Sequence, residues 1–135
     1  MIGALLDQIA SIQFPTAGRV SDVLDADLAW KDENRFFHFY KADIDEGPFA
    51  HCELRLAKEG DKALVILMAR AEEPVAEADL ELAPLGDLLE FTVNPHIPPE
   101  GTREQVFQRD PAKVSVQLWA RRGTLRSAAV SWGPS

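Results

Sequence analysis

KVSVQLWARRGTLRSAAVSW, residues 113–132, is the stretch that decides the fold. Its first half alternates apolar Val114, Val116 and Leu118 with other side chains, which is the period of a strand buried on one face. The Arg-Arg-Gly sequence at 121–123 then supplies turn residues before a second apolar-rich arm. The stretch therefore predicts a C-terminal β-hairpin.

Three more strands are predicted in the middle of the chain. Aromatic and β-branched residues from Arg35 onward favour a strand, and the acidic Gly-Pro segment 43–48 supplies a turn. The returning arm covers about 49–57, and a second turn at 58–62 leads to ALVILMA at 63–69. The unbroken apolarity of this last run predicts a central strand covered on both faces.

The N-terminal segment has the pattern of an amphipathic helix. Its aliphatic residues recur at helical spacing, and the helix should end before Pro15. These residues are Ile2, Leu5, Leu6, Ile9 and Ile12. Residues 20–29 fit either a helical turn or an edge strand, and the acidic segment 72–86 fits either a short helix or a solvated crossover.

The remaining segments complete the expected sheet. Residues 88–93 predict a strand, and the proline-rich 94–101 must be a loop. Residues 102–107 could resume as extended or helical chain. We therefore expect one α+β domain over 1–135, with an N-terminal amphipathic helix packed on a curved, mainly antiparallel sheet of about six or seven strands.

Composition narrows the class of protein. The 135 residues are 46% hydrophobic and 27% charged, as is ordinary for one globular domain. The single cysteine, Cys52, forms no intrachain disulfide, and the first residues lack the pattern of a signal peptide or membrane span. These features predict a cytoplasmic protein without membrane attachment.

Charge argues against anionic partners. The net charge is −8, which repels nucleic acids and anionic membranes at long range. Residues 1–99 hold 19 Asp and Glu against 8 Lys and Arg, whereas residues 100–135 hold 3 against 6. The second segment forms a basic patch only if its strands lie together. Nucleic-acid stacking on Trp119 is therefore disfavoured despite the neighbouring arginines.

Two histidines are expected to face each other in the aromatic hairpin. A turn over 43–46 would place His38 opposite His51 and Tyr40 opposite Phe49, with Cys52 on the other face. Phe37 and Phe39 would share that other face. A metal ion needs further ligands, and His96 and Cys52 are the only obvious donors, so no metal site and no cofactor are predicted.

Catalytic signatures are not evident in the sequence. Cys52 stands between apolar residues and beside acidic ones, which favours a buried thiol over a thiolate nucleophile. No serine occupies a G-x-S-x-G elbow, and the glycines form no phosphate-binding loop. The carboxylates are too numerous for a catalytic pair to be identified.

A non-catalytic acidic binding protein, of the inhibitor, chaperone or immunity type, is the function that we expect. Its acidic surface would steer a basic protein partner. The alternative is a small-ligand-binding or enzymatic cavity between sheet and helix, lined by Phe36 with His38, Tyr40 and Trp119. The predicted binding residues are His38, Tyr40, His51, Trp119 and Arg121. Strand edges and the apolar helix stripe could also pair two copies into a homodimer.

Overall fold

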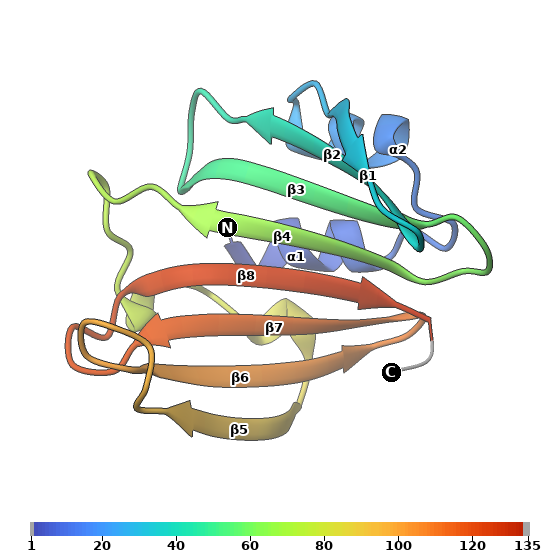
Figure 1. Ribbon diagram of the computed structural model, residues 1–135. Helices are drawn as coiled ribbons and strands as arrows, with labels where there is room; N and C mark the ends of the chain where they lie inside the picture. Colours follow the sequence, from blue (N-terminus) through green and yellow to red (C-terminus); the bar gives the residue numbers. More distant parts are fainter. Residues whose placement is uncertain (1, 134–135) are drawn as a thin grey trace.

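The computed structural model describes residues 2–133 as two α-helices and one antiparallel sheet of eight strands (Figure 1). The helices are α1 (Ile2–Ala10) and α2 (Ala17–Leu24), and two single-turn 3-10 helices follow β4, η1 (Glu77–Asp79) and η2 (Ala83–Leu85). The strands are β1 (Ala29–Glu33), β2 (Phe37–Asp43), β3 (Phe49–Ala57), β4 (Ala63–Ala69), β5 (Leu88–Asn94), β6 (Thr102–Arg109), β7 (Ala112–Trp119) and β8 (Leu125–Trp132). Their order is β1-β2-β3-β4-β8-β7-β6-β5, and the sheet is not closed.

The α+β class is confirmed, but the sheet has one strand more than the upper expectation and there is a second helix. The second helix, α2, covers the first half of the segment left open at 20–29, and the added strand, β1, begins at its last residue and continues to Glu33. Thr16 Oγ1 accepts a hydrogen bond of 3.1 Å from the Arg19 N–H and so caps α2, which ends at Asp25 in the left-handed conformation. β1 then pairs with β2, and all its residues are exposed, so it carries no alternation that a sequence pattern could reveal.

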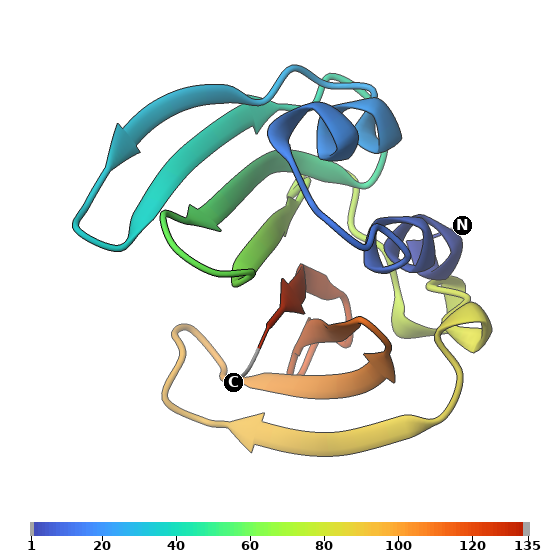
Figure 2. The same ribbon diagram turned by 90° about the vertical axis from the view of Figure 1, so that its right-hand side faces the viewer.

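Both helices lie on one side of the sheet (Figure 2). Ile2, Leu6 and Ile9 of α1 are fully buried, and they share one core with alternate residues of the central strands. At the end of this core Trp132 of β8 donates from Nε1 to the Ile12 carbonyl at 2.7 Å. The predicted N-terminal amphipathic helix and C-terminal hairpin therefore pack against each other. No helix within residues 2–133 is long and apolar enough to cross a membrane.

The strand predicted to be central, β4, lies between β3 and β8 but is covered on one face only. Ala63, Val65 and Leu67 are buried against the helix side. On the opposite side, Leu64 and Ile66 are half-buried and Met68 is 36% exposed. We call this side of the sheet, away from the helices, the open face. On β3 and β4 it carries His51, Glu53, Arg55, Leu64, Ile66 and Met68.

The predicted register of the aromatic hairpin is wrong. β2 continues to Asp43, which pairs with His51, so the connection comprises residues 44–48 and the pairing shifts. His38 pairs with Leu56 and Tyr40 pairs with Leu54. An odd shift in register exchanges the faces of one arm relative to the other. His38 therefore shares the helix side with Cys52, whereas His51 shares the open face with Phe37 and Phe39.

Candidate binding face

The centre of the open face is a row of aliphatic side chains on β4. Leu64, Ile66 and Met68 follow one another at every second position. Their partners on β8 are the small residues Ser131, Ala129 and Ser127, in that order. Small neighbours do not cover the larger side chains, and neither helix lies on this side (Figures 1 and 2). The row is therefore accessible to a binding partner.

One end of the open face is acidic. Asp43 and the exposed His51 form a hydrogen-bonded pair, with 2.9 Å between His51 Nδ1 and Asp43 Oδ1. Beside them Ile66 and Met68 line a hollow of about 400 Å³. Asp45 lies in the following turn, and together with Asp43 it borders a second hollow, whose other carboxylates come from the end of α2 and the segment after it. These are Asp22, Asp25 and Asp27.

The opposite end of the open face holds a pocket with basic walls. It has a volume of about 370 Å³ and lies where β4 begins and β8 ends. Its apolar wall includes Phe37, Leu64, Pro111 and Trp132. Within residues 2–133, its charged lining residues are all cations, namely Arg55, Lys62 and Lys113. The open face thus has mostly carboxylates at one end of its aliphatic row, where Lys41 is also present, and cations at the other.

The five residues predicted to bind do not form one site. His51 and Trp119 lie on the open face, and Arg121 is exposed in the β7–β8 turn. His38 and Tyr40 lie on the helix side of β2. Phe36, expected beside them in the alternative cavity, is exposed in the β1–β2 turn. Trp119 on β7 is separated from β2 by β3, β4 and β8 in the sheet order.

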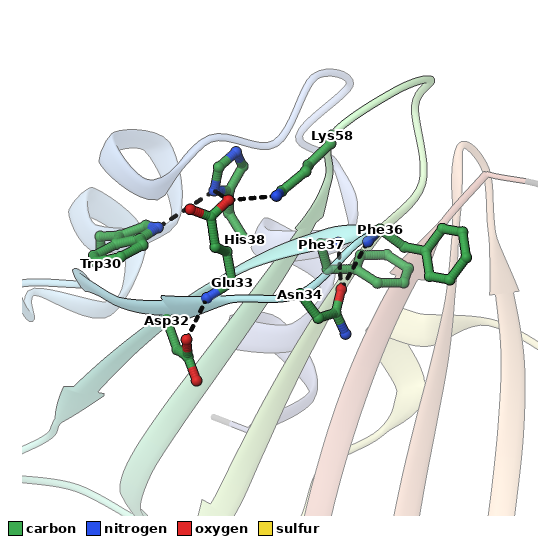
Figure 3. Close-up of polar contacts among 8 residues, drawn as sticks. All are labelled: Trp30, Asp32, Glu33, Asn34, Phe36, Phe37, His38 and Lys58. Carbon is green, nitrogen blue, oxygen red and sulfur yellow. Dashed lines mark hydrogen bonds and ion pairs between the residues drawn. The ribbon is translucent and has the colours of Figure 1, made fainter.

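His38 belongs instead to a polar cluster at the β1–β2 turn (Figure 3). Trp30 donates from Nε1 to His38 Nδ1 at 3.3 Å, and Glu33 Oε2 lies 3.9 Å from the same ring nitrogen. The other partner of this carboxylate is the Lys58 ammonium group. A hydrogen bond and charge attraction from Lys58 lower the pKa of Glu33. The cluster ties the turn to the end of β3.

The arginines near Trp119 are already engaged within the chain. The guanidinium carbons of Arg122 and Arg126 lie 4.7 and 5.3 Å from the centre of the Trp119 ring. Arg122 also pairs with Glu100 at 3.2 Å. Burial raises the pKa of Glu100, but hydrogen bonds from the Arg122 N–H and guanidinium outweigh it and lower the pKa.

The C-terminal strands β6, β7 and β8 are neighbours in the sheet, which is the condition for a basic patch. Several of their cations, however, are paired with acidic residues. Arg103 pairs with Glu77 at 3.3 Å, and Arg109 pairs with Asp7 at 2.7 Å. Both carboxylates come from the acidic first part of the chain. Folding therefore neutralises part of the charge asymmetry between the two segments.

Burial, followed by the neighbouring Glu53 charge, raises the pKa of the Cys52 thiol to about 12, so the thiol stays protonated near neutral pH. Among residues 2–133, no group of three or more His, Cys, Asp or Glu side chains is arranged to hold a metal ion. His96 lies in the β5–β6 loop, on a different part of the chain from His38 and His51.

Comparison with known proteins identifies no family for this chain. Neither a protein-family model, nor a curated protein, nor a solved structure matches the chain.

Sequence reasoning missed the basic pocket and the uncovered aliphatic row. Arg55, Lys62 and Lys113 come from β3, the β3–β4 turn and β7, and each is an ordinary isolated cation in the sequence. No local motif could have joined them. The run at 63–69 did signal apolar side chains on both faces of a strand, but a sequence run does not show whether both faces are covered.

Proposed function

We propose that this chain is a non-catalytic binding protein that holds a protein partner on the open face of its sheet. The observation that carries the proposal is the row of Leu64, Ile66 and Met68 on a central strand, opposite the helices. Burial of apolar surface is the main favourable term in protein association. A partner that covered this row would bury side chains that the fold itself leaves accessible.

The acidic end of the open face supports the choice of a basic partner. Asp43 stands next to the aliphatic row. Asp45 and the carboxylates of α2 and its following segment border a second hollow with Asp43. Complementary charge raises the association rate and fixes the orientation of a partner. We therefore propose a partner with an apolar segment that carries Lys or Arg at the end nearest Asp43. The unpaired Cys52 agrees with the further proposal that binding occurs in the cytoplasm.

A photo-crosslinking amino acid placed at Ile66 tests this function. The matched control carries the same group at Gln8, which is exposed on the helix side. A specific protein adduct is expected in cell extract from position 66 and not from position 8. The purified partner should then bind the Ile66→Glu variant at least about tenfold more weakly than wild type, and the Gln8→Glu variant equally well. Identical adducts from both positions, or unchanged binding by Ile66→Glu, would refute the proposal.

Small-ligand binding is a second candidate function, and the 370 Å³ pocket is the observation that favours it. Ligand pockets in proteins typically measure about 300–1,000 Å³ and combine apolar walls with a few polar groups. The pocket lies at an end of the open face rather than between sheet and helix. Native mass spectrometry of the purified protein should retain a small molecule if this function is correct.

Self-association is proposed for the edge strand β5. Four of its large apolar side chains are about half-exposed, namely Leu88, Leu89, Phe91 and Val93. An edge strand also presents unpaired backbone groups that can extend a sheet into a second copy. Sedimentation at several concentrations should show a dimer, and the dimer should be lost in a Phe91→Lys variant. A monomer at every concentration would exclude it.

A further inference from the structure

We propose that the pocket at the basic end of the open face binds a small amphiphilic anion, an alkyl or aromatic body that carries a carboxylate or a phosphate. The proposal deepens the second candidate function, small-ligand binding, on which it rests. It names the chemical class of ligand, and its test needs no protein partner, although Leu64 belongs both to the pocket and to the aliphatic row on β4.

The apolar part of the pocket comes from strands that are not consecutive in the chain. Phe37 begins β2, Leu64 lies near the start of β4, and Trp132 ends β8. Pro111 adds a further apolar surface from the β6–β7 turn. Phe37, Leu64 and Pro111 give an alkyl chain or ring a surface on which water is displaced, whereas the Trp132 side chain is buried in the core and only borders the pocket.

The charged part of the pocket is the reason for an anion. Lys62 and Lys113 form no ion pair with any residue among 2–133. Arg55 is held by Glu53, with 2.8 Å between Arg55 Nη2 and Glu53 Oε2. No Asp or Glu is among the lining residues in the part of the chain that the structure describes. Within the described residues, two of the three cations of the pocket therefore lack an ion-pair partner, in a protein whose net charge is −8.

For a ligand inside the pocket, the charges that line the pocket outweigh the net charge of the protein. The Debye length is about 8 Å at physiological ionic strength, so the carboxylates at the far end of the molecule are screened from the pocket. An anionic head group within hydrogen-bonding reach of Lys62 and Lys113 is attracted by both ammonium groups. The pocket combines two lysine charges with an aromatic wall and a volume of about 370 Å³. This combination fits a small amphiphile rather than a polyanion.

Titration calorimetry with three matched probes tests the inference on the full chain. The probes are decanoate, decyl phosphate and 1-decanol, each used at concentrations at which it forms no micelles. They share an alkyl body and differ in the head group. Decanoate and decyl phosphate should bind at least about tenfold more tightly than 1-decanol, because only they engage the lysines. Comparison of the two anions shows which head group the pocket prefers.

The matched variants are Lys62→Glu/Lys113→Glu and Lys31→Glu. All three lysines are exposed, so the folded state should be retained, as thermal melting will verify. The double variant should lose at least about tenfold in affinity for both anions, whereas Lys31→Glu on β1 should bind like wild type. Equal binding of 1-decanol, or an unaffected double variant, would refute the anion preference and leave small-ligand binding in place. Failure of all three probes to bind would refute both.

Discussion

Arg109 on β6 donates two hydrogen bonds to one carboxylate oxygen of Asp7 on α1. The distances to Asp7 Oδ1 are 2.9 Å from Nε and 2.7 Å from Nη2. The two residues are 102 positions apart in the chain, and the pair joins the first helix to the C-terminal half of the sheet. Charge-assisted hydrogen bonds with this geometry orient the groups that they join.

A double-mutant cycle should detect this coupling. The side chains of Asp7 and Arg109 are 31% and 38% exposed, so solvent screens their attraction. The coupling in Asp7→Ala and Arg109→Ala should therefore be about 0.5–1 kcal/mol of unfolding free energy, measured in urea. The control cycle uses Lys41 and Glu53, whose charged atoms are 3.9 Å apart, and it should give a smaller value. Equal coupling in the two cycles would contradict the assigned role of Arg109.

Gly3 should not tolerate alanine. A Cβ atom at this position would lie 2.0 Å from the carbonyl oxygen of Glu81, far inside van der Waals contact. The Gly3 N–H also donates to the Leu80 carbonyl at 3.2 Å, so backbone from the η1–η2 region lies directly against α1. Gly3→Ala must displace one of these segments, and we expect a loss of about 1–3 kcal/mol in unfolding free energy.

Gly18→Ala is the matched control for this substitution, because Gly18 also lies in a helix. The nearest atom to its added Cβ would be Thr16 Oγ1 at 3.9 Å. Alanine favours the helix and reduces the freedom of the unfolded chain, so this variant should be more stable by about 0.4–1 kcal/mol. Opposite signs in the two melting temperatures would verify the prediction, and similar effects would contradict it.

The strands that could be predicted from the sequence are those whose own residues alternate between apolar and other side chains. Val114, Val116 and Leu118 alternate strictly, and all three are buried on the helix side. By contrast, register depends on the length of a connection. One strand that continues to Asp43 is enough to change the partner of His51 and to separate it from His38.

The candidate site was less predictable for a related reason. Its groups meet only because β4 and β8 become neighbours, although 55 residues separate the end of one from the start of the other. Lys62 and Lys113 have no signal in sequence that joins them, since their proximity is a product of the strand order. The apolar run of β4 could be recognised, whereas the missing cover on its second face is a property of the whole fold.

The two faces of β4 should respond differently to a hydroxyl group. Val65 is fully buried, so Val65→Thr leaves a hydroxyl without water and should reduce the unfolding free energy by about 1–3 kcal/mol. Ile66 is half-buried on the open face, and the hydroxyl of Ile66→Thr remains in contact with solvent. We expect less than about 1 kcal/mol for this change in urea unfolding. A larger cost at Ile66 would mean that the open face is covered.

Cys52 should make stability decrease in alkaline solution. Burial and the Glu53 charge raise the pKa of the folded thiol to about 12, compared with 9.0 for an ordinary thiol. Below pH 9.0 both states keep the proton, and above it the unfolded state loses the proton first, so unfolding becomes more favourable.

The loss from this thiol should reach about 1 kcal/mol near pH ~10. Other groups also titrate in this range, so the measurement is the change in urea unfolding free energy between pH ~8 and ~10, compared in wild type and Cys52→Ala. The decrease should be smaller in Cys52→Ala. The same decrease in both proteins would show that the thiol makes no contribution.

Glu33 should titrate below the usual range for a glutamate because Lys58 stabilises its carboxylate (Figure 3). The lowered pKa means that the stability from this pair is present above the ordinary glutamate pKa of 4.5 and is lost as the pH falls through the folded-state pKa. Lys58→Met removes the charge and should raise the Glu33 pKa toward the ordinary value, as measured by NMR titration of the side-chain carboxyl carbon. Lys31→Met, on the same strand as Glu33, is the control and should leave the pKa unchanged. A Glu33 pKa that does not move in Lys58→Met would assign the shift to another neighbour, and His38, which also lowers it, would then be the residue to change.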